Sequence, residues 1–394
     1  MTLSNDSNDA LALELTHLEV QAFRVPLRNP IKVAFGTFRD RPMVLVRAVD
    51  RSGAEGWGEI WCNWPAVGAE HRARLAADLG ERLVGRRFDT PAQAFEQLTR
   101  QMEVLVLQTG EPGPVAAVLA GIDIALWDLV ARRQGQPLHR VLGSDPARKR
   151  VPVYATGINP DEPEVFAAAR QAEGHRAFKL KIGFGMERDL RNLRAMREAL
   201  GPQAVIACDA NQAWRLDEAL GFVREASPLG LTWLEEPLRV DAPAADWAAL
   251  AKASSTPLAG GENLQDRAFD DAIAAGALQV MQPDVTKWGG ITGNLRVGRA
   301  AVAAGLRYCP HYFSGGVALM ASLQVLAAAG GAGLLEFDPH PNPGRELIVT
   351  WPCSRPTGAG RRERAAGSAA DSAPCSAAPS NIHAAAGSAG NAAF

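Results

Sequence analysis

The feature of this 394-residue sequence that most constrains its fold is a series of eight short apolar runs between residues 151 and 337. Successive runs begin 22 to 27 residues apart, which is room for one strand, one helix and two loops. Eight such units favour a closed parallel β/α barrel over an open sheet. An open doubly wound sheet is the alternative, but the Gly-rich phosphate turn expected after its first strand is missing at residues 155–159. The runs are Val151–Tyr154, Phe178–Ile182, Val205–Cys208, Thr232–Leu234, Leu258–Gly260, Val280–Gln282, Arg307–Cys309 and Leu334–Phe337.

The region before the barrel, residues 1–148, has a different pattern. Strand-like runs come first and helix-like stretches follow, an order that predicts an α+β unit. We therefore expect an α/β protein with an N-terminal α+β domain and a barrel domain over residues 149–340. The expected strands are Leu18–Val25, Met43–Val49 and Gly56–Glu59, and the expected helices are Arg72–Leu83, Ala92–Leu107 and Val115–Arg133.

The end of the chain, residues 341–394, loses this regular pattern from about residue 350. Of the 44 residues from Trp351 onward, 25 are Ala, Gly or Ser, and aliphatic residues are almost absent. Such a segment buries too little apolar surface to offset its ordering entropy. We expect it to be disordered.

The composition excludes several classes of function. Net charge is −2 with Arg residues scattered among acids, so no nucleic-acid or anionic-membrane partner is expected. The start lacks a secretory pattern, and no run approaches the ~18 apolar residues of a membrane span. The five cysteines lie far apart without a CxxC pair, which is typical of thiols in a reducing cytoplasm.

Ionisable residues end seven consecutive strands of the expected barrel. Because parallel strands meet at one mouth, these side chains should come together there. Asp209, Glu235 and Glu262 end adjacent strands, and three neighbouring carboxylates would repel one another without a cation between them. Hard oxygen ligands favour Mg²⁺ over zinc. Separate surface salt bridges are the alternative, which three carboxylates at equivalent positions disfavour.

Basic residues stand on the flanking strands. Lys179 and Lys181 lie two apart, so they point to the same face. Two adjacent ammonium groups near a metal lower each other's pKa toward that of a usable base. His311 and Asp284 end neighbouring strands, where the aspartate could fix the imidazole tautomer. Surface lysines and a structural histidine are the alternatives. Glu336, on the last strand, could present a protonated carboxyl or accept a hydrogen bond.

Several motifs in combination resemble the enolase superfamily, in its mandelate racemase and muconate lactonizing branch. The resemblance covers about residues 15 to 348. The motifs are Gly121-Ile-Asp-Ile-Ala-Leu-Trp-Asp-Leu, Phe178-Lys-Leu-Lys-Ile-Gly, Asp209-Ala-Asn-Gln, Trp233-Leu-Glu-Glu-Pro, Gly261-Glu-Asn and Pro283-Asp-Val-Thr-Lys-Trp-Gly-Gly.

The resemblance implies a (β/α)7β modified TIM barrel with an N-terminal α+β capping domain that the end of the chain helps to close. It implies Mg²⁺ on Asp209, Glu235 and Glu262. Muconate lactonizing relatives have aspartate where Glu262 stands and a lysine base where Asp284 stands, so this chain resembles the mandelate racemase-like subgroup. Lys287 is then expected to be structural.

The implied reaction removes the proton next to a carboxylate to give an enediolate, which Mg²⁺, Lys179 and Glu336 would stabilise. Lys181 and His311 would each take or return a proton. We expect dehydration of a sugar acid or other small hydroxy acid, with racemisation or epimerisation of a 2-hydroxy acid as the alternative. The small carboxylate substrate would contact Asn211, Phe35 and Trp61, and a homo-oligomer is expected.

A catalytically silent homologue is the third hypothesis. Relatives usually end in apolar strands that return to the capping domain, whereas this sequence becomes Ala/Gly/Ser/Arg-rich after about Ile348, as an out-of-frame reading of a GC-rich gene would. An incompletely closed capping domain would hold substrate poorly.

Overall fold

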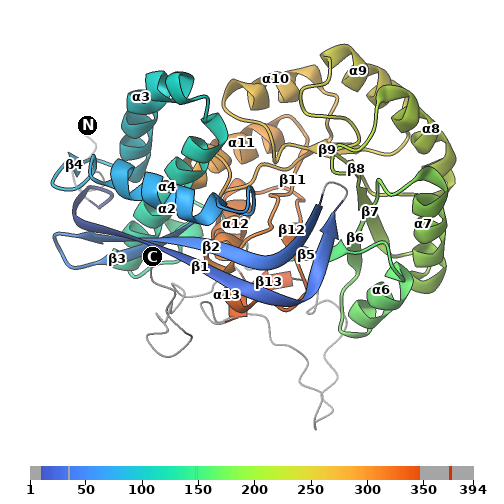
Figure 1. The fold of residues 1–394 in the computed structure, drawn as a ribbon, viewed down its shortest axis with the longest axis horizontal. Coiled ribbons are helices and arrows are strands. Elements are labelled where there is room, and N and C mark those ends of the chain that lie inside the picture. Colours follow the sequence, from blue (N-terminus) through green and yellow to red (C-terminus); the bar gives the residue numbers. More distant parts are fainter. Residues whose placement is uncertain (1–9, 34–35, 147, 149, 347–371, 375–394) are drawn as a thin grey trace, which may run out of the picture.

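The computed structural model describes residues 10–33, 36–146, 148, 150–346 and 372–374, and it has two parts of different construction (Figure 1). The N-terminal part is an antiparallel sheet with three long helices, and the second part is a parallel sheet wrapped by helices. The chain passes from one to the other between α5 (Leu138–Val141) and β5 (Arg150–Ile158).

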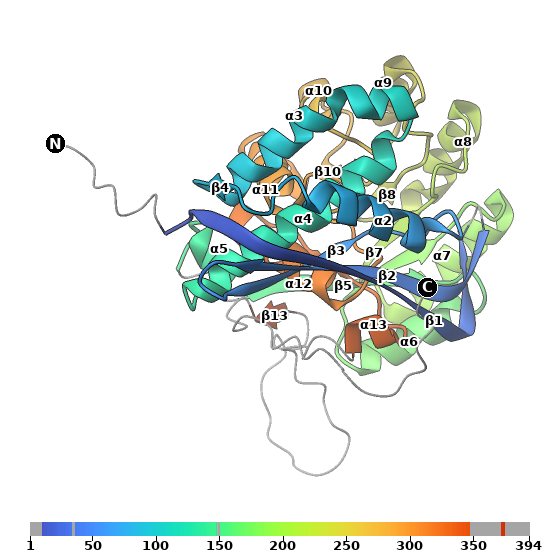
Figure 2. The same cartoon turned by 60° about the vertical axis from the view of Figure 1, so that its left-hand side comes forward.

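The N-terminal sheet has the strand order β3-β2-β1-β4, and its helices pack on one face (Figure 2). All three expected strands and all three expected helices are confirmed. Their bounds are longer, except that the first helix begins earlier than expected and ends at Gly80 rather than at Leu83. The strands are β1 (Leu13–Val33), β2 (Gly36–Asp50), β3 (Glu55–Ile60) and β4 (Arg87–Phe88), and the helices are α2 (Gly68–Gly80), α3 (Pro91–Thr109) and α4 (Pro112–Arg133).

Helix α4 lies directly against β3 because glycines remove the side chains between them. A Cβ on Gly58 would lie 1.9 Å from the carbonyl oxygen of Gly121, and one on Gly56 would lie 2.1 Å from that of Ala125. By length and composition alone α4 could cross a membrane, a point that the sequence reading missed. Its most apolar window is 83% buried inside the protein, which is what a core helix requires.

The second part confirms the eight predicted strands. Hydrogen bonding runs in the order β11-β10-β9-β8-β7-β6-β5-β12, all parallel. The two end strands also meet, since the N–H of Leu334 donates to Sγ of Cys309 at 3.3 Å. The further strands are β6 (Ala177–Lys181), β7 (Val205–Asp209), β8 (Leu234–Glu235), β9 (Leu258–Gly260), β10 (Val280–Met281), β11 (Arg307–Tyr308) and β12 (Leu335–Phe337).

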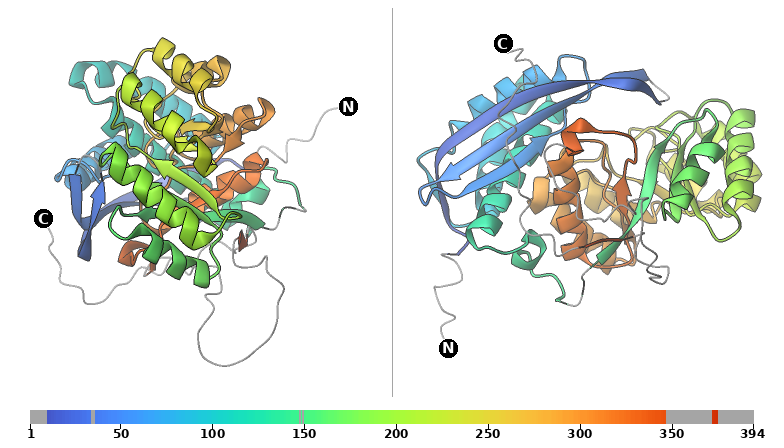
Figure 3. Two further views of the ribbon diagram at one scale, coloured as in Figure 1. Left: turned by 90° about the vertical axis from the view of Figure 1, so that its right-hand side faces the viewer. Right: turned by 90° about the horizontal axis from the view of Figure 1, so that it is seen from below.

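Helices alternate with these strands and cover the outside of the barrel (Figures 1 and 3). Large buried side chains fill the inside, among them Tyr154 and Trp233, whose rings meet edge to face at 5.1 Å. The helices are α6 (Pro163–Ala172), α7 (Met186–Leu200), α8 (Leu216–Ala226) with the 3₁₀ turn η1 (Ser227–Leu229), α9 (Ala244–Ala253), α10 (Arg267–Ala275), α11 (Gly290–Ala303), α12 (Gly316–Ala329) and α13 (Pro343–Glu346).

Buried polar contacts join the two parts. Glu59, at the end of β3, accepts hydrogen bonds from the N–H groups of Gly315 and Ala318 at the start of α12. Asp123 on α4 accepts from the N–H and the hydroxyl of Thr292 on α11 at 2.9 and 2.7 Å. The long β1–β2 hairpin extends from the N-terminal sheet across the barrel (Figures 1 and 2).

Most of the segment for which disorder is expected lies outside the described residues. Within it, Ser372–Pro374 forms the short strand β13, which pairs antiparallel with β5 at Arg150–Pro152.

Candidate active site

The ends of β6, β7, β8 and β12 bring five of the predicted residues into contact. Nζ of Lys179 lies 2.6 Å from Oε1 of Glu235, 2.8 Å from Oε1 of Glu336 and 3.7 Å from Oδ2 of Asp209. Nζ of Lys181 lies 2.5 Å from Oδ2 of Asp209. Lys179 is fully buried, so these contacts form at the bottom of the barrel mouth rather than on the surface.

The ends of β9, β10 and β11 form a second group. Nε2 of His311 lies 3.2 Å from Oε2 of Glu262, and Nδ1 of His311 lies 2.7 Å from Oδ2 of Asp284. The histidine is therefore held between two carboxylates. Lys287 donates to Oε2 of Glu262 at 3.1 Å and to Oδ1 of Asn263 at 2.7 Å, so it supports a predicted metal ligand.

Both carboxyl oxygens of Glu336 accept hydrogen bonds. One oxygen is bound by Lys179, and the other accepts from the N–H of Tyr312 at 2.9 Å. Burial alone would raise the pKa of this carboxyl, but the charges on Lys179 and His311 lower it. The arrangement favours the acceptor alternative over a protonated carboxyl.

The lowering of the lysine pKa values is expected beside a bound metal, and the protein groups alone act in the opposite direction. Burial works against the charged form, but Glu235 and Glu336 raise the pKa of Lys179 well above its ordinary value. Asp209 likewise raises the pKa of Lys181 more than the neighbouring ammonium of Lys179 lowers it. Each lysine is paired with a carboxylate on one of the next strands, Lys179 with Glu235 and Lys181 with Asp209.

The pKa values of the other ionisable groups at the mouth depend on whether a charged partner offsets their burial. Burial would lower the pKa of His311, but Glu262 and the hydrogen bond with Asp284 raise it to about 9. Burial raises the pKa of Glu235 to about 7 and that of Glu236 well above its usual range. Burial opposes ionisation of Glu262 as well, but His311 and Lys287 hold its pKa below the ordinary value.

The donor set at the mouth fits a hard divalent cation. Among the described residues no three His, Cys, Asp or Glu side chains lie together at metal-ligand spacing, because ammonium and imidazolium groups separate the three predicted ligands. Six carboxyl groups (Asp209, Glu235, Glu236, Glu262, Asp284 and Glu336) nevertheless face four cationic groups (Lys179, Lys181, Lys287 and His311). Carboxyl groups therefore outnumber cationic groups at the mouth, and their oxygens are the donors that Mg²⁺ prefers.

The three predicted substrate contacts differ in what surrounds them. Asn211, with φ of +46°, donates its N–H and Nδ2 to Asp209, and its buried Oδ1 has no partner among the described residues. Trp61 comes from the N-terminal part, where its ring lies 5.0 Å from Nζ of Lys287. It therefore stands at the mouth of the barrel. Phe35 lies outside the described residues.

Sequence reasoning missed several supporting residues. Gln282 donates from Nε2 to Oε2 of Glu235 at 2.7 Å, and Trp233 donates to the same oxygen at 3.3 Å. Glu236 accepts from Nδ2 of Asn263 at 2.7 Å while its second oxygen is buried without a partner among the described residues. Gln282 and Trp233 each stand within two residues of a residue that the sequence singled out, which was the available signal.

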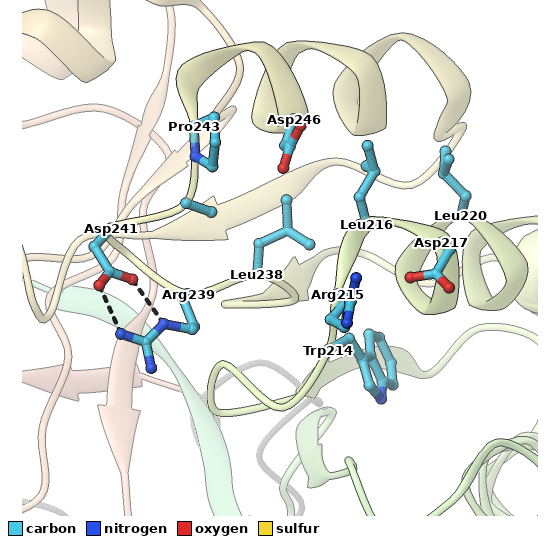
Figure 4. Close-up of a pocket in the computed structure, with 11 residues that line it drawn as sticks. Trp214, Arg215, Leu216, Asp217, Leu220, Leu238, Arg239, Asp241, Pro243 and Asp246 are labelled. Carbon is cyan, nitrogen blue, oxygen red and sulfur yellow. Dashed lines mark hydrogen bonds and ion pairs between the residues drawn. The ribbon is translucent and has the colours of Figure 1, made fainter.

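A separate groove lies outside the barrel, between the first turns of α8 and α9 (Figure 4). Apolar side chains such as Trp214 and Leu238 line it. At its edge lie Arg239 and Asp241, which two hydrogen bonds join. It contains none of the predicted catalytic residues or metal ligands.

Comparison with known proteins agrees with the fold and the site. Residues 16–143 match the N-terminal domain of mandelate racemase/muconate lactonizing enzyme, and residues 164–368 match the enolase C-terminal domain-like family. The chain therefore belongs to the mandelate racemase/muconate lactonizing enzyme family of the enolase superfamily. Its parallel barrel and separate antiparallel capping sheet are the fold of that superfamily.

Individual relatives point to enzymes acting on small carboxylates. D-galactarolactone cycloisomerase of Agrobacterium fabrum is 32% identical over 86% of this chain and 91% of the relative. A mandelate racemase/muconate lactonizing enzyme structure from Bordetella bronchiseptica is 52% identical, with a TM-score of 0.80, over 85% of this chain and 90% of that one. A Streptomyces coelicolor racemase with bound magnesium is 28% identical, with a TM-score of 0.73, over 82% of this chain and 89% of that one.

Other curated relatives are named as arabinonate dehydratase, L-talarate/galactarate dehydratase, N-succinyl-L-Arg/Lys racemase and L-Ala-D/L-Glu epimerase. The chain is thus an enzyme of the lyase or racemase type.

Proposed function

We propose that this enzyme removes the proton next to the carboxylate of a small hydroxy acid and dehydrates a sugar acid. The observation that carries the proposal is the order of the strands. Lys181 on β6 and His311 after β11 flank the carboxylates of β7, β8 and β9, which lie between them in the sheet. A substrate held over the carboxylates would have one proton-transfer group on each side.

Mg²⁺ is the proposed cofactor, with Asp209, Glu235 and Glu262 as its ligands. The excess of buried carboxyl groups over cationic groups and the all-oxygen donor set support it. When bound, Mg²⁺ stabilises negative charge on the oxygens of a substrate carboxylate.

The chain's own residues would move the protons. Lys181 or His311 takes the α-proton, and the other group donates a proton to the departing β-hydroxyl, leaving an enol that tautomerises to a 2-keto acid. Asp284 holds Nδ1 of His311, so Nε2 is the atom that exchanges a proton. Lys179, fixed between Glu235 and Glu336, donates a hydrogen bond to the oxygen on which charge develops.

The test is a panel of four- to six-carbon sugar acids incubated with enzyme and Mg²⁺ in D₂O. Appearance of a 2-keto acid with deuterium incorporation at C3 supports dehydration. Absence of both keto product and α-proton exchange across the panel, from a folded enzyme with Mg²⁺ bound, would overturn the proposal and leave a catalytically silent homologue.

Racemisation or epimerisation of a 2-hydroxy acid is the second candidate. The same placement of bases on both sides of the carboxylates favours it, because inversion needs one base for each face. Exchange of the α-proton with inversion and without keto product in the same panel would select it.

A further inference from the structure

The guanidinium of Arg41 is buried with hydrogen-bonding capacity left over. Arg41 lies on β2, in the long hairpin of the N-terminal part, and is 5% exposed. Its Nη2 donates to Oδ2 of Asp338, which follows the last barrel strand. Its Nε and Nη1 are buried and have no hydrogen-bond partner among the described residues. A buried donor without a partner is destabilising, so such a group in a native protein calls for an explanation.

The position of Arg41 explains what those donors could meet. Its guanidinium stacks on the ring of Phe313, with Cζ 4.3 Å from the ring centroid, and Phe313 is two residues beyond His311. Its partner Asp338 is two residues beyond Glu336, and residues two apart in extended chain lie on the same side. Arg41 therefore reaches from the N-terminal part to the two segments that directly follow His311 and Glu336 at the barrel mouth.

A neighbouring arginine shows the contrast. Arg345 is also buried, at 4% exposure, but its Nη1 donates to the carbonyl oxygen of Asp338 and its Nη2 to that of His340 and to Glu346. Both of its terminal nitrogens are therefore engaged within the protein. Arg41 is held in place by one carboxylate and one aromatic ring, and it keeps two donors for another molecule.

We propose that Arg41 binds a second carboxylate at the far end of the substrate, so that the enzyme prefers dicarboxylic sugar acids (aldarates) over monocarboxylic ones. The inference rests on the proposed function, in which the first carboxylate lies over Asp209, Glu235 and Glu262. A permanently charged guanidinium with unused N–H donors in a buried site forms stronger hydrogen bonds with a carboxylate than with a hydroxymethyl group. The Asp338 contact keeps the plane of the guanidinium fixed before binding.

The test compares acids that differ only in the far carboxylate, namely galactarate with galactonate and glucarate with gluconate. Binding is measured by calorimetry with Mg²⁺ in a His311→Asn background, so that the acids are not consumed. The variants are Arg41→Gln, Arg41→Lys and, as a matched control, Arg39→Gln, which removes the same charge from an exposed position on the same strand. Circular dichroism checks that each variant is folded.

We expect the parent to bind the dicarboxylate of at least one pair about tenfold or more tightly than its partner. Arg41→Gln should remove that preference, Arg41→Lys should keep part of it, and Arg39→Gln should leave it unchanged. Equal affinity within every pair in the parent, or equal loss in the Arg39 variant, would overturn the inference while leaving the proposed function intact. If the folded parent binds no acid of either class, the proposed function itself fails.

If Arg41→Gln does not fold, the parent and the lysine variant still decide the matter. A preference that is present in the parent and weakened in Arg41→Lys supports the inference. A preference that the lysine variant retains in full overturns the role of the guanidinium donors.

Discussion

Oδ2 of Asp284 lies 2.7 Å from Nδ1 of His311, while Oδ1 of the same carboxylate accepts hydrogen bonds from the N–H and the hydroxyl of Thr286 at 2.7 and 2.6 Å. Asp284 is 3% exposed, and because both of its carboxylate oxygens have hydrogen-bond partners its orientation is fixed. The imidazole is thereby held with Nε2 directed toward Glu262. An orienting carboxylate of this kind contributes to catalysis through the group it holds.

Replacing Asp284 with Asn should lower kcat on the order of 100-fold or more, because the amide no longer fixes the tautomer and charge of His311. Thr286→Val, which removes one of the two donors to Asp284, should give a smaller loss of about tenfold. Steady-state kinetics on the best acid of the panel measures both. A near wild-type kcat for Asp284→Asn would show that the contact is structural.

Single variants of the two flanking bases should separate dehydration from racemisation. In a dehydratase, loss of the base stops α-proton exchange, whereas loss of the acid leaves exchange in place and stops only elimination. We therefore expect just one of Lys181→Met and His311→Asn to retain exchange in D₂O, measured by proton NMR. If each variant exchanges the α-proton of the opposite enantiomer, the enzyme is a racemase and the dehydratase proposal is wrong.

Removal of divalent cations with EDTA should abolish activity, and added Mg²⁺ should restore it. Glu262→Gln removes one of the buried negative charges and should weaken Mg²⁺ binding about tenfold or more, measured by calorimetry. Asp246→Asn, in the groove outside the barrel, is the control and should bind Mg²⁺ as the wild type does. Equal Mg²⁺ affinity in the Glu262 variant would remove that carboxylate from the ligand set.

The sequence was sufficient to predict the strands and the polar residues that end them. The reason is local, because each strand has its own apolar run, and parallel strands of a barrel must bring Asp209, Glu235 and Glu262 to one mouth. The assignment of these residues to metal binding and catalysis stays a prediction that the variants above will test.

Contacts between the two parts of the protein were not predictable in this way. Arg41 and Asp338 are 297 positions apart, and Glu59 and Gly315 are 256 apart. No periodic pattern links such positions, so the sequence gives no sign that Arg41 is buried.

The close contact of α4 with β3 should make Gly58 intolerant of any side chain. Gly58→Ala places a methyl group 1.9 Å from the carbonyl oxygen of Gly121, so helix and strand must separate, at a cost of about 2 kcal/mol or more. Gly113→Ala, in the first turn of the same helix with nothing within 4 Å, should leave stability unchanged or slightly higher. Urea unfolding compares the two variants, and equal stability would contradict the packing argument.

Stability should also depend on pH through His139, which is 1% exposed and contacts Gln324 on α12 rather than any residue of the candidate active site. Its N–H and its Nδ1 lie 2.8 and 2.7 Å from Oε1 of Gln324. Burial lowers the pKa of this imidazole. The unfolded chain therefore binds more protons than the folded one below the ordinary pKa of about 6.5, and the stability present above that pH is lost as the pH falls through it.

His139→Asn keeps a side-chain N–H donor for Gln324 but cannot titrate. The wild type should therefore lose more of its free energy of unfolding than this variant between pH 7 and pH 5, by about 1.4 kcal/mol for each unit by which the pKa is lowered. Urea unfolding at four pH values measures how the free energy of unfolding changes with pH. The same change in the wild type and in His139→Asn would show that the titration of His139 does not contribute to it.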